Sequence, residues 1–181
     1  MEDCRDHEAV KLAIENASKF LGINTIKDFQ LEAATAALLG KDVFVAKPTG
    51  SGKSLVFQIL PFAHYQLQKM MGNELAVPGF IIVISPLTAL MKDQMQRLKD
   101  TVKEACKNLD ETTQEAFLEN FNPISLSDRG KLSTLKNMTF AFLYCSPESI
   151  LSTHLKEVRT QWFQEKLLAV VIDESHCIIK W

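Results

Sequence analysis

Lys47-Pro48-Thr49-Gly50-Ser51-Gly52-Lys53-Ser54 is the stretch that decides the fold of this 181-residue chain. It follows a short apolar run at 43–46, which we expect to form a buried strand, and it leads into a helical pattern at 53–68. A strand, a glycine-rich loop and a helix in this order are the context of a phosphate-binding loop. The strict pattern of such loops begins with glycine, and Lys47 stands at that position here.

The chemistry of the loop depends on its glycines, its lysine and its last hydroxyl. Gly50 and Gly52 let the backbone curl so that successive N–H groups point at phosphates, and the positive end of the following helix adds to the attraction. We expect Lys53 to reach the β- and γ-phosphates and Ser54 to bind Mg²⁺. The alternative interpretation is a glycine-rich turn before a helix. The predicted nucleotide-binding residues of the loop are Thr49, Gly50, Ser51, Gly52, Lys53 and Ser54.

A second motif, Asp173-Glu174-Ser175-His176, follows the apolar run at 167–172. Asp173 comes at the carboxyl end of a predicted strand, where α/β sheets place ligand-binding groups, and we expect it to hold Mg²⁺. Glu174 would polarise an attacking water, although a solvated loop start is the alternative for this acidic pair. His176 would relay between the nucleotide and a nucleic-acid site, or it is a packed histidine. The two motifs predict nucleoside triphosphate hydrolysis, with Lys53, Asp173, Glu174 and His176 as the catalytic residues.

Apolar runs at 80–84 and 140–145 predict two more strands. Continuous apolar runs indicate strands that are buried on both faces. Because these strands alternate with helical patterns, we predict an α/β fold with a mostly parallel central sheet and helices on both faces. The ranges with helical spacing or composition are 11–21, 28–39, 88–103, 112–120 and 128–137.

The bulk composition narrows the class of protein. A hydrophobic fraction of 46% over 181 residues fits one domain with a sizeable core. The formal net charge of -2 excludes a global basic field, so any nucleic-acid binding must be local. The four cysteines form no Cys-x-x-Cys pair and are expected to be reduced thiols. The polar start and the short apolar runs predict an intracellular protein without a membrane partner, in the cytoplasm or the nucleus, and in the nucleus if it is eukaryotic.

The motifs and their order resemble one family. Asp173-Glu174-Ser175-His176 resembles the Asp-Glu-Ala-His box of superfamily 2 helicases, and further stretches resemble RecQ-type DNA helicases. Those stretches are Gln30-Leu31-Glu32-Ala33, residues 48–58, residues 85–94 and Ser146-Pro147-Glu148. The resemblance covers residues 20–181 and implies the first RecA-like lobe of a P-loop NTPase, at 25–181, after a helical lead-in at 1–24.

The resemblance implies roles for further residues. Gln30 would recognise the adenine edge, which makes ATP with Mg²⁺ the expected cofactor. Ile26-Lys27 stands where the family has phenylalanine-arginine, so stacking on the adenine is expected to be weaker. Single-stranded or partly duplex DNA is the expected partner, in DNA repair and recombination. The predicted nucleic-acid contacts are Ser85, Pro86, Thr88, Lys92 and Trp181.

The resemblance also implies a 3′-to-5′ DNA helicase whose second RecA-like lobe supplies an arginine to the ATP site. The chain is expected to hold the first lobe alone, truncated after the acidic box. ATP binding with little hydrolysis and no unwinding is therefore expected of it. Two alternatives stay open. One is a non-catalytic module that docks nucleic acid or a partner, and the other is a different superfamily 2 motor, such as an RNA helicase or a duplex translocase.

Overall fold

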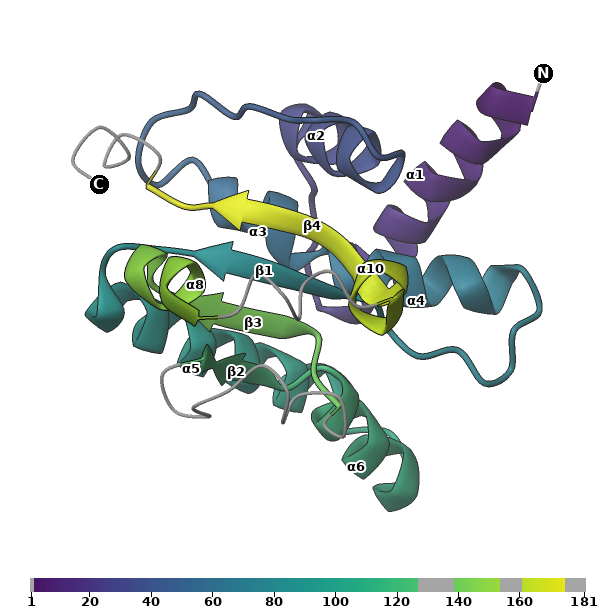
Figure 1. Cartoon of the computed structure of the whole chain (residues 1–181). Coiled ribbons are helices and arrows are strands. Elements are labelled where there is room, and N and C mark those ends of the chain that lie inside the picture. Colours follow the sequence, from purple (N-terminus) through teal and green to yellow (C-terminus); the bar gives the residue numbers. More distant parts are fainter. Residues whose placement is uncertain (1, 127–138, 154–160, 175–181) are drawn as a thin grey trace. The chain divides into compact units, whose positions relative to one another are not determined.

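The computed structural model describes residues 2–126, 139–153 and 161–174. The chain divides into two compact units, Met1–Gly79 and Phe80–Trp181, and the elements are labelled along it in Figure 1. The predicted helix at 128–137, and with it His176 and Trp181, lies outside the described residues.

The first unit is helical in its described part. α1 packs against α2 and α4, and the side of α1 that carries Ala13, Ile14 and Ala17 is fully buried. Gly22 follows α1 and Gly40 follows α2, with φ angles of 71° and 75°, as expected for glycines that end helices. The helices of this unit are α1 (Glu2–Phe20), α2 (Asp28–Leu38), α3 (Lys53–Gln58) and α4 (Leu60–Met70).

The predicted helix at 53–68 is interrupted, and this part of the prediction is wrong. α3 ends at Gln58, and α4 begins at Leu60 after a turn at Ile59. The physical reason is Pro61, which has no N–H to donate to the carbonyl of Phe57 and whose ring crowds that carbonyl.

The predicted strand at 43–46 is also wrong. Residues 41–48 have no regular secondary structure, and the Phe44 side chain is 83% exposed. A strand exists only where a neighbouring strand accepts and donates its backbone hydrogen bonds, and this segment has no such neighbour among the described residues. The apolar run therefore enters the glycine-rich loop as an extended, exposed segment.

The second unit contains a four-stranded parallel sheet with the strand order β2-β3-β1-β4. In the pairing register, Ile82 of β1 lies opposite Leu143 of β3 and Val170 of β4. The strands are β1 (Phe80–Ile84), β2 (Pro123–Ser125), β3 (Phe142–Cys145) and β4 (Leu167–Ile172).

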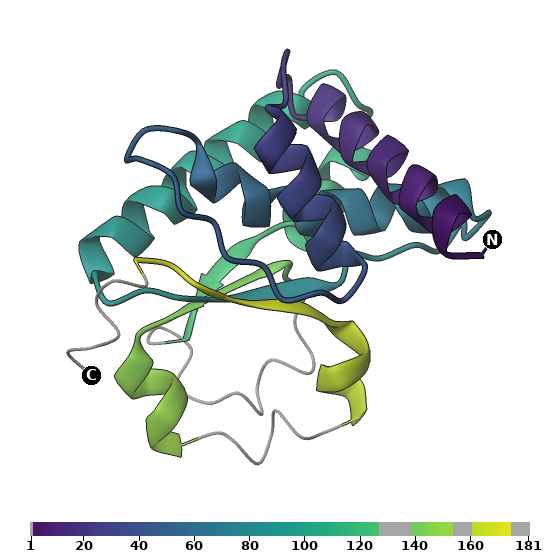
Figure 2. The same ribbon diagram turned by 90° about the horizontal axis from the view of Figure 1, so that it is seen from above.

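Helices cover both faces of this sheet, as predicted. Figure 2 shows α5 on one face and α8 and α10 on the other. Ser146 caps α8, because its Oγ accepts a hydrogen bond from the Ser149 N–H at 3.2 Å, and Asp110 caps α6 by accepting from the Thr113 N–H at 3.0 Å. The helices are α5 (Thr88–Cys106), α6 (Glu111–Asn120), α8 (Pro147–Thr153) and α10 (Gln161–Lys166).

The core of the second unit is aromatic at its centre. The Phe80 ring lies 5.0 Å from Phe140 and 4.8 Å from Phe163 of α10, centroid to centroid. Such tilted and edge-on pairs add to the free energy of burial. Ile81 and Val83 alternate with this set along β1 and are fully buried on the other face of the sheet.

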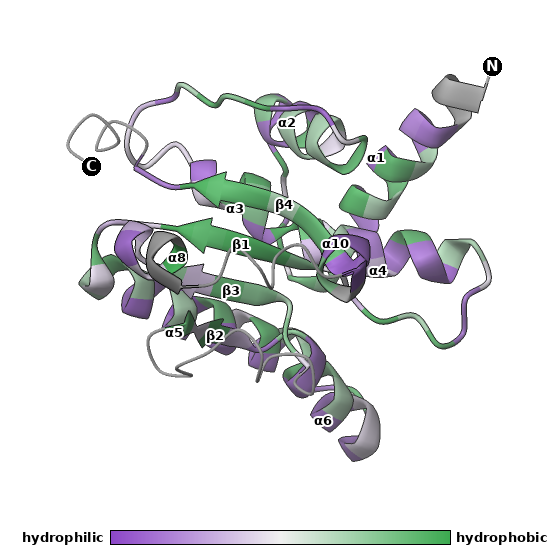
Figure 3. Ribbon diagram, in the orientation of Figure 1, coloured by the Kyte–Doolittle hydropathy of each residue, from purple (hydrophilic) through white to green (hydrophobic). Residues whose placement is uncertain are grey.

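β4 departs from the prediction that every strand is buried on both faces. It lies at the edge of the sheet, and its residues Val170 and Ile172 are 53% and 47% exposed. Figure 3 shows apolar colouring along most of β4. The departure arises because burial depends on the place of a strand in the sheet, which its own composition does not specify.

The packing of β3 predicts the reactivity of a cysteine. Cys145 is 1% exposed, and desolvation raises the pKa of its thiol to about 12. Since the thiolate is the nucleophile, we expect Cys145 in the folded chain to resist iodoacetamide at about pH 8, where a free cysteine has a thiolate fraction near one quarter. Peptide mass spectrometry of native and urea-unfolded chain measures this. Equal labelling in both states would show that Cys145 is not packed in the core.

Candidate functional site

The glycine-rich loop is closed by short-range hydrogen bonds. The Ser51 N–H donates to the Pro48 carbonyl at 3.2 Å, and Gly50 and Gly52 have φ angles of 79° and 92°. Gly52 is required for a second reason, because a Cβ at this position would lie 2.6 Å from Nε2 of Gln30. The backbone therefore enters α3 in a conformation that only glycine adopts without strain.

Gln30, predicted as an adenine contact, holds the loop in this structure. Its side chain is 3% exposed, its Nε2 donates to the Gly52 carbonyl at 2.8 Å, and its Oε1 accepts from the Lys27 N–H at 2.9 Å. Lys27 adds a second tie, since its Nζ donates to the Ser51 carbonyl at 2.9 Å. The side chains at the start of α2 thus determine the position of the loop backbone.

Positive charge gathers around the loop. Lys53 Nζ donates to the carbonyls of Lys47 and Pro48 at 2.8 and 3.0 Å, and Lys47 Nζ lies 5.3 Å from the centroid of the Phe29 ring. Within the described ranges, neither of these lysines nor Lys27 forms an ion pair with a carboxylate. Three ammonium groups and a glycine-rich backbone suit a polyphosphate, whose oxygens are better partners for Lys53 than neutral carbonyls.

The loop contains three further hydroxyl side chains, those of Thr49, Ser51 and Ser54. Thr49 is exposed before the turn, and Ser54 is half-buried in the first turn of α3. The Ser51 Oγ is buried without a hydrogen-bond partner among the described residues. The first unit therefore brings together Gln30, Gly52 and Lys53 as one cluster.

In the second unit, Asp173 follows β4 and is held in three ways. Its N–H donates to the Ile84 carbonyl at 2.9 Å, its Oδ1 accepts from the Glu174 N–H at 3.1 Å, and its Oδ2 accepts from Nε2 of Gln94 at 2.9 Å. Gln94 lies on α5, and the sequence analysis assigned it no role at the site. The contact joins residues 79 positions apart, so local sequence gave no signal for it.

Glu174 has a φ angle of 54°, the one positive value among the described non-glycine residues. Left-handed backbone costs an L-residue roughly 1–2 kcal/mol. Strain of this kind concentrates at functional sites, where surrounding contacts enforce it. This residue lies in the turn that directly follows β4.

Four of the predicted nucleic-acid residues, all except Trp181, lie at the start of α5 or just before it. Ser85 is fully buried, and its N–H donates to the Cys145 carbonyl at 3.1 Å, while Thr88 and Lys92 are exposed one turn apart. Pro86 is half-buried and shapes the turn between β1 and the helix. This turn fixes where α5 begins relative to the sheet.

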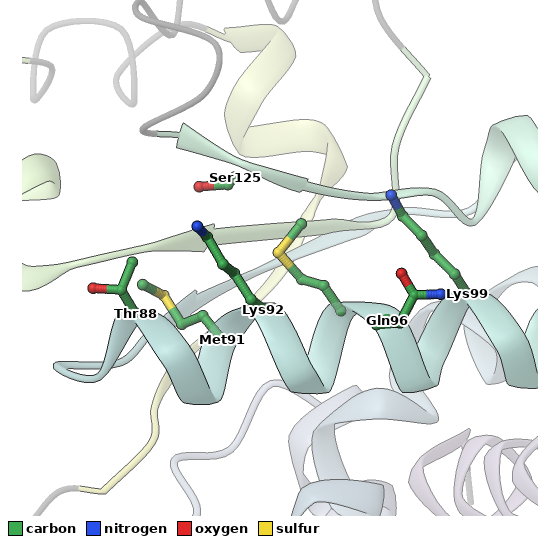
Figure 4. A pocket seen from close by; sticks show the side chains of 7 residues that line it. Thr88, Met91, Lys92, Gln96, Lys99 and Ser125 are labelled. Atoms are coloured by element: carbon green, nitrogen blue, oxygen red, sulfur yellow. The ribbon is translucent and has the colours of Figure 1, made fainter.

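Thr88 and Lys92 line a groove of about 200 Å³ along α5. Lys92 and Lys99 rise from the same side of the helix, and Lys92 points toward Ser125 of β2 (Figure 4). The sequence analysis missed Lys99, although its spacing of seven residues from Lys92 places both on one helix face. The groove is lined by Thr88, Met91, Lys92, Met95, Gln96, Lys99 and Ser125.

The described residues contain no group of three or more His, Cys, Asp or Glu side chains that could hold a metal ion. Mg²⁺ does not require such a cage, because it keeps several waters and takes one or two carboxylates. The carboxylate oxygens of Asp173 and Glu174 are donors of the type that Mg²⁺ takes. Among the helices that the structure describes, none is long and apolar enough to cross a bilayer.

Comparison with known proteins identifies the family. Residues 27–181 match the DEAD/DEAH box helicase family. The ATP-dependent DNA helicase hus2/rqh1 of Schizosaccharomyces pombe is 36% identical over 154 residues, which cover 84% of this chain and 10% of that protein. The RecQ-like DNA helicase BLM of Xenopus laevis is 33% identical over 165 residues, with 90% and 10% covered.

A bacterial relative extends the comparison. The ATP-dependent DNA helicase RecQ of Pasteurella multocida is 31% identical over 171 residues, which cover 93% of this chain and 22% of that protein. The resemblance to RecQ-type helicases is therefore confirmed, and the chain spans about a tenth of the length of the first two relatives. This chain belongs to the DEAD/DEAH box helicase family, among relatives of the RecQ type.

Proposed function

We propose that this chain is the ATP-binding lobe of a RecQ-like 3′-to-5′ DNA helicase, which couples ATP hydrolysis to movement along single-stranded DNA and to duplex separation. The observation that carries the proposal is the arrangement of the glycine-rich loop. Nε2 of buried Gln30 donates to the Gly52 carbonyl at 2.8 Å, and Nζ of Lys53, the next residue, donates to the Lys47 carbonyl in the same loop. The relatives that are similar in sequence to this chain are named DNA helicases, which supports DNA as the substrate.

The residues at the loop fit a nucleoside triphosphate. Lys53 would exchange two neutral carbonyls for phosphate oxygens, a change that favours charge-assisted hydrogen bonds. Gln30 would recognise adenine only by exchanging its hydrogen bond to Gly52, so binding of the base and order in the loop compete for one amide. Thr49, Ser51 and Ser54 complete the set of hydroxyl ligands.

The acidic pair would supply the hydrolytic chemistry. We assign Mg²⁺ binding to Ser54 and Asp173, polarisation of the attacking water to Glu174, and the relay role to His176. Magnesium would neutralise phosphate charge while these side chains orient water. The hydrogen bonds on both oxygens of Asp173 support this assignment, because they hold the carboxylate in one orientation.

The groove along α5 is the proposed path of a DNA backbone. Thr88 and Lys92, at the N-terminal end of the groove, would contact phosphates, and Ser85 and Pro86 would set the start of the helix. Trp181 would couple DNA contact to hydrolysis. A local groove with exposed Lys92 and Lys99 fits a chain whose net charge is -2, because the attraction needs no basic field over the whole surface.

The activity of the whole protein is part of the proposal. We propose that residues 25–181 form the lobe, that residues 1–24 lead into it, and that a second RecA-like lobe supplies an arginine to the ATP site. An arginine of this kind raises turnover by a factor of roughly 10³–10⁵ in related triphosphatases. The 181-residue chain by itself should therefore bind ATP, hydrolyse little and separate no strands.

Lys53→Ala should weaken the binding of ATP by at least about tenfold. Loss of charge-assisted hydrogen bonds to phosphate removes about 1.5–3 kcal/mol, which corresponds to at least about tenfold in affinity. Titration of a fluorescent ATP analogue with Mg²⁺ measures the effect, and Lys19→Ala on exposed α1 surface is the matched control. If the parent chain itself binds no nucleotide, the proposal fails and a non-catalytic docking module is the better description.

Gln30→Ala should loosen the loop without unfolding the first unit. The substitution removes the hydrogen bond to the Gly52 carbonyl and opens a cavity beneath the loop. We expect faster hydrogen exchange in peptides spanning 47–54 and unchanged exchange in α1. Mass-spectrometric hydrogen exchange makes the comparison, and equal protection of the loop in both proteins would refute a positioning role for Gln30.

Lys92→Ala and Lys99→Ala should each weaken binding of an oligo-dT strand. Loss of one phosphate contact lowers the slope of log K against log salt by about 0.7 for a single strand. Fluorescence anisotropy over a salt series measures that slope. Arg97→Ala is the control, because Arg97 lies on the same helix but is ion-paired with Asp93 at 3.0 Å. A slope that changes for Arg97 and not for the lysines would place the DNA elsewhere.

A further inference from the structure

We propose that Gln94 is a positioning residue that links the groove side of α5 to the carboxylate of Asp173, so that contact between α5 and a nucleic-acid strand adjusts the metal-binding oxygen. The inference rests on the function proposed above for Asp173 and for the groove. It gives Gln94 a role that the function proposed for the phosphate loop and the acidic pair does not include.

The contact is specific in its atoms. Gln94 Nε2 donates to Asp173 Oδ2 at 2.9 Å, while Asp173 Oδ1 is engaged by the N–H of Glu174. A neutral amide orients a carboxylate and leaves its negative charge available, whereas a lysine or arginine would neutralise it. Gln94 therefore suits a carboxylate that must both point in one direction and attract a cation.

The other end of the amide is unusual. Gln94 Oε1 is buried and has no hydrogen-bond partner among the described residues. A buried acceptor without a partner costs about 1–3 kcal/mol, so a donor arriving here gains more than at an exposed site. Mg²⁺ keeps several of its waters when a protein binds it, and the hydrogen of such a water is a donor of the right kind.

The helix provides the mechanical link. Gln94 follows Lys92 by two residues, which places the two side chains about 200° apart around the helix axis. Lys92 lines the groove, and Gln94 reaches Asp173 on another side of the same turn. A small rotation of α5 on contact with phosphates would therefore change the length or angle of the hydrogen bond to Asp173.

The backbone of Asp173 is anchored independently of α5. Its N–H bonds the Ile84 carbonyl at 2.9 Å, and β1 and β4 pair through Ile84 and Ile172. The main chain at this point thus moves with the sheet, while the carboxylate also follows the helix. This division makes the side-chain orientation, rather than the position of the strand, the quantity that α5 can alter.

The test uses the 181-residue chain and Gln94→Met, which keeps the side-chain volume and removes the donor. Titration of Mg²⁺ against a bound fluorescent ATP analogue gives the apparent Mg²⁺ affinity, with and without saturating oligo-dT. We expect Gln94→Met to lower that affinity about fivefold, in line with loss of one hydrogen bond of about 1 kcal/mol. We also expect oligo-dT to shift the Mg²⁺ midpoint of the parent and not that of the variant.

The affinities for nucleotide and for oligo-dT, both measured without Mg²⁺, should be unchanged in Gln94→Met, because neither contact uses Gln94 and the coupling appears only when Mg²⁺ is bound. Gln94→Asn is the second variant, and it should reproduce the effect because its shorter amide cannot reach Asp173. Gln114→Met on α6 is the matched control, since Gln114 is also a half-buried helix residue. An unchanged Mg²⁺ midpoint in both Gln94 variants, or an equal loss of all three affinities, would overturn the proposal.

A further arm separates this inference from the proposed function. Asp173→Asn should abolish the dependence of nucleotide affinity on Mg²⁺. If Asp173→Asn has no effect, the metal role of Asp173 is wrong and the link through Gln94 falls with it. If Asp173→Asn has the expected effect and the Gln94 variants do not, the proposed function stands and only the positioning role is overturned.

Discussion

The parallel pairing of β1 with both β3 and β4 is the constraint on which the candidate site in the second unit depends. Ile84 lies opposite Cys145 on one side and Ile172 on the other, so three strands end in the same register. The next residues in each chain segment are Ser85, Ser146 and Asp173, and all three leave the sheet at one edge. Ser146 caps α8, Ser85 lies three residues before the first residue of α5, and Asp173 begins the acidic pair. A shift of one residue in the pairing of β1 with β4 would move Asp173 away from Gln94 and from the start of α5, and the same shift between β1 and β3 would displace Ser146.

The charge arrangement around the glycine-rich loop explains why this segment suits phosphate even though Lys47 replaces its usual first glycine. The lysine backbone carbonyl receives the Lys53 ammonium, and the lysine side chain lies over Phe29. Both interactions use neutral partners, and neither cancels a positive charge. Gln30 holds the turn through its hydrogen bond to the Gly52 carbonyl, and its neutral amide adds no charge. The loop is thus ordered by hydrogen bonds, and the positive charges of its lysines stay available to attract an anion.

Local sequence predicted those features that local chemistry determines. The alternation of strands and helices, and with it the parallel sheet, follows from side chains that are near in sequence. The strand at 43–46 and the burial of β4 could not be settled in that way, because pairing partners and sheet order are non-local. The interruption between α3 and α4 could have been predicted from Pro61, because proline inside a helical pattern breaks the helix. Gln94 could not be found at all, since its partner lies 79 residues away and its own pattern is that of an ordinary helix residue.

The left-handed backbone of Glu174 sets the stability of the fold against the water-polarising role proposed for this residue. Glycine or asparagine would adopt a φ angle of 54° with less strain than glutamate, yet neither has a carboxylate. The most stable version of this turn is therefore not the version that can polarise water. A search for thermostable variants would be drawn toward replacing Glu174, and the resulting protein would keep its fold and its nucleotide while losing turnover. If the proposed role of Glu174 holds, sequence selection for stability alone would in this way yield a domain that binds nucleotide without hydrolysing it.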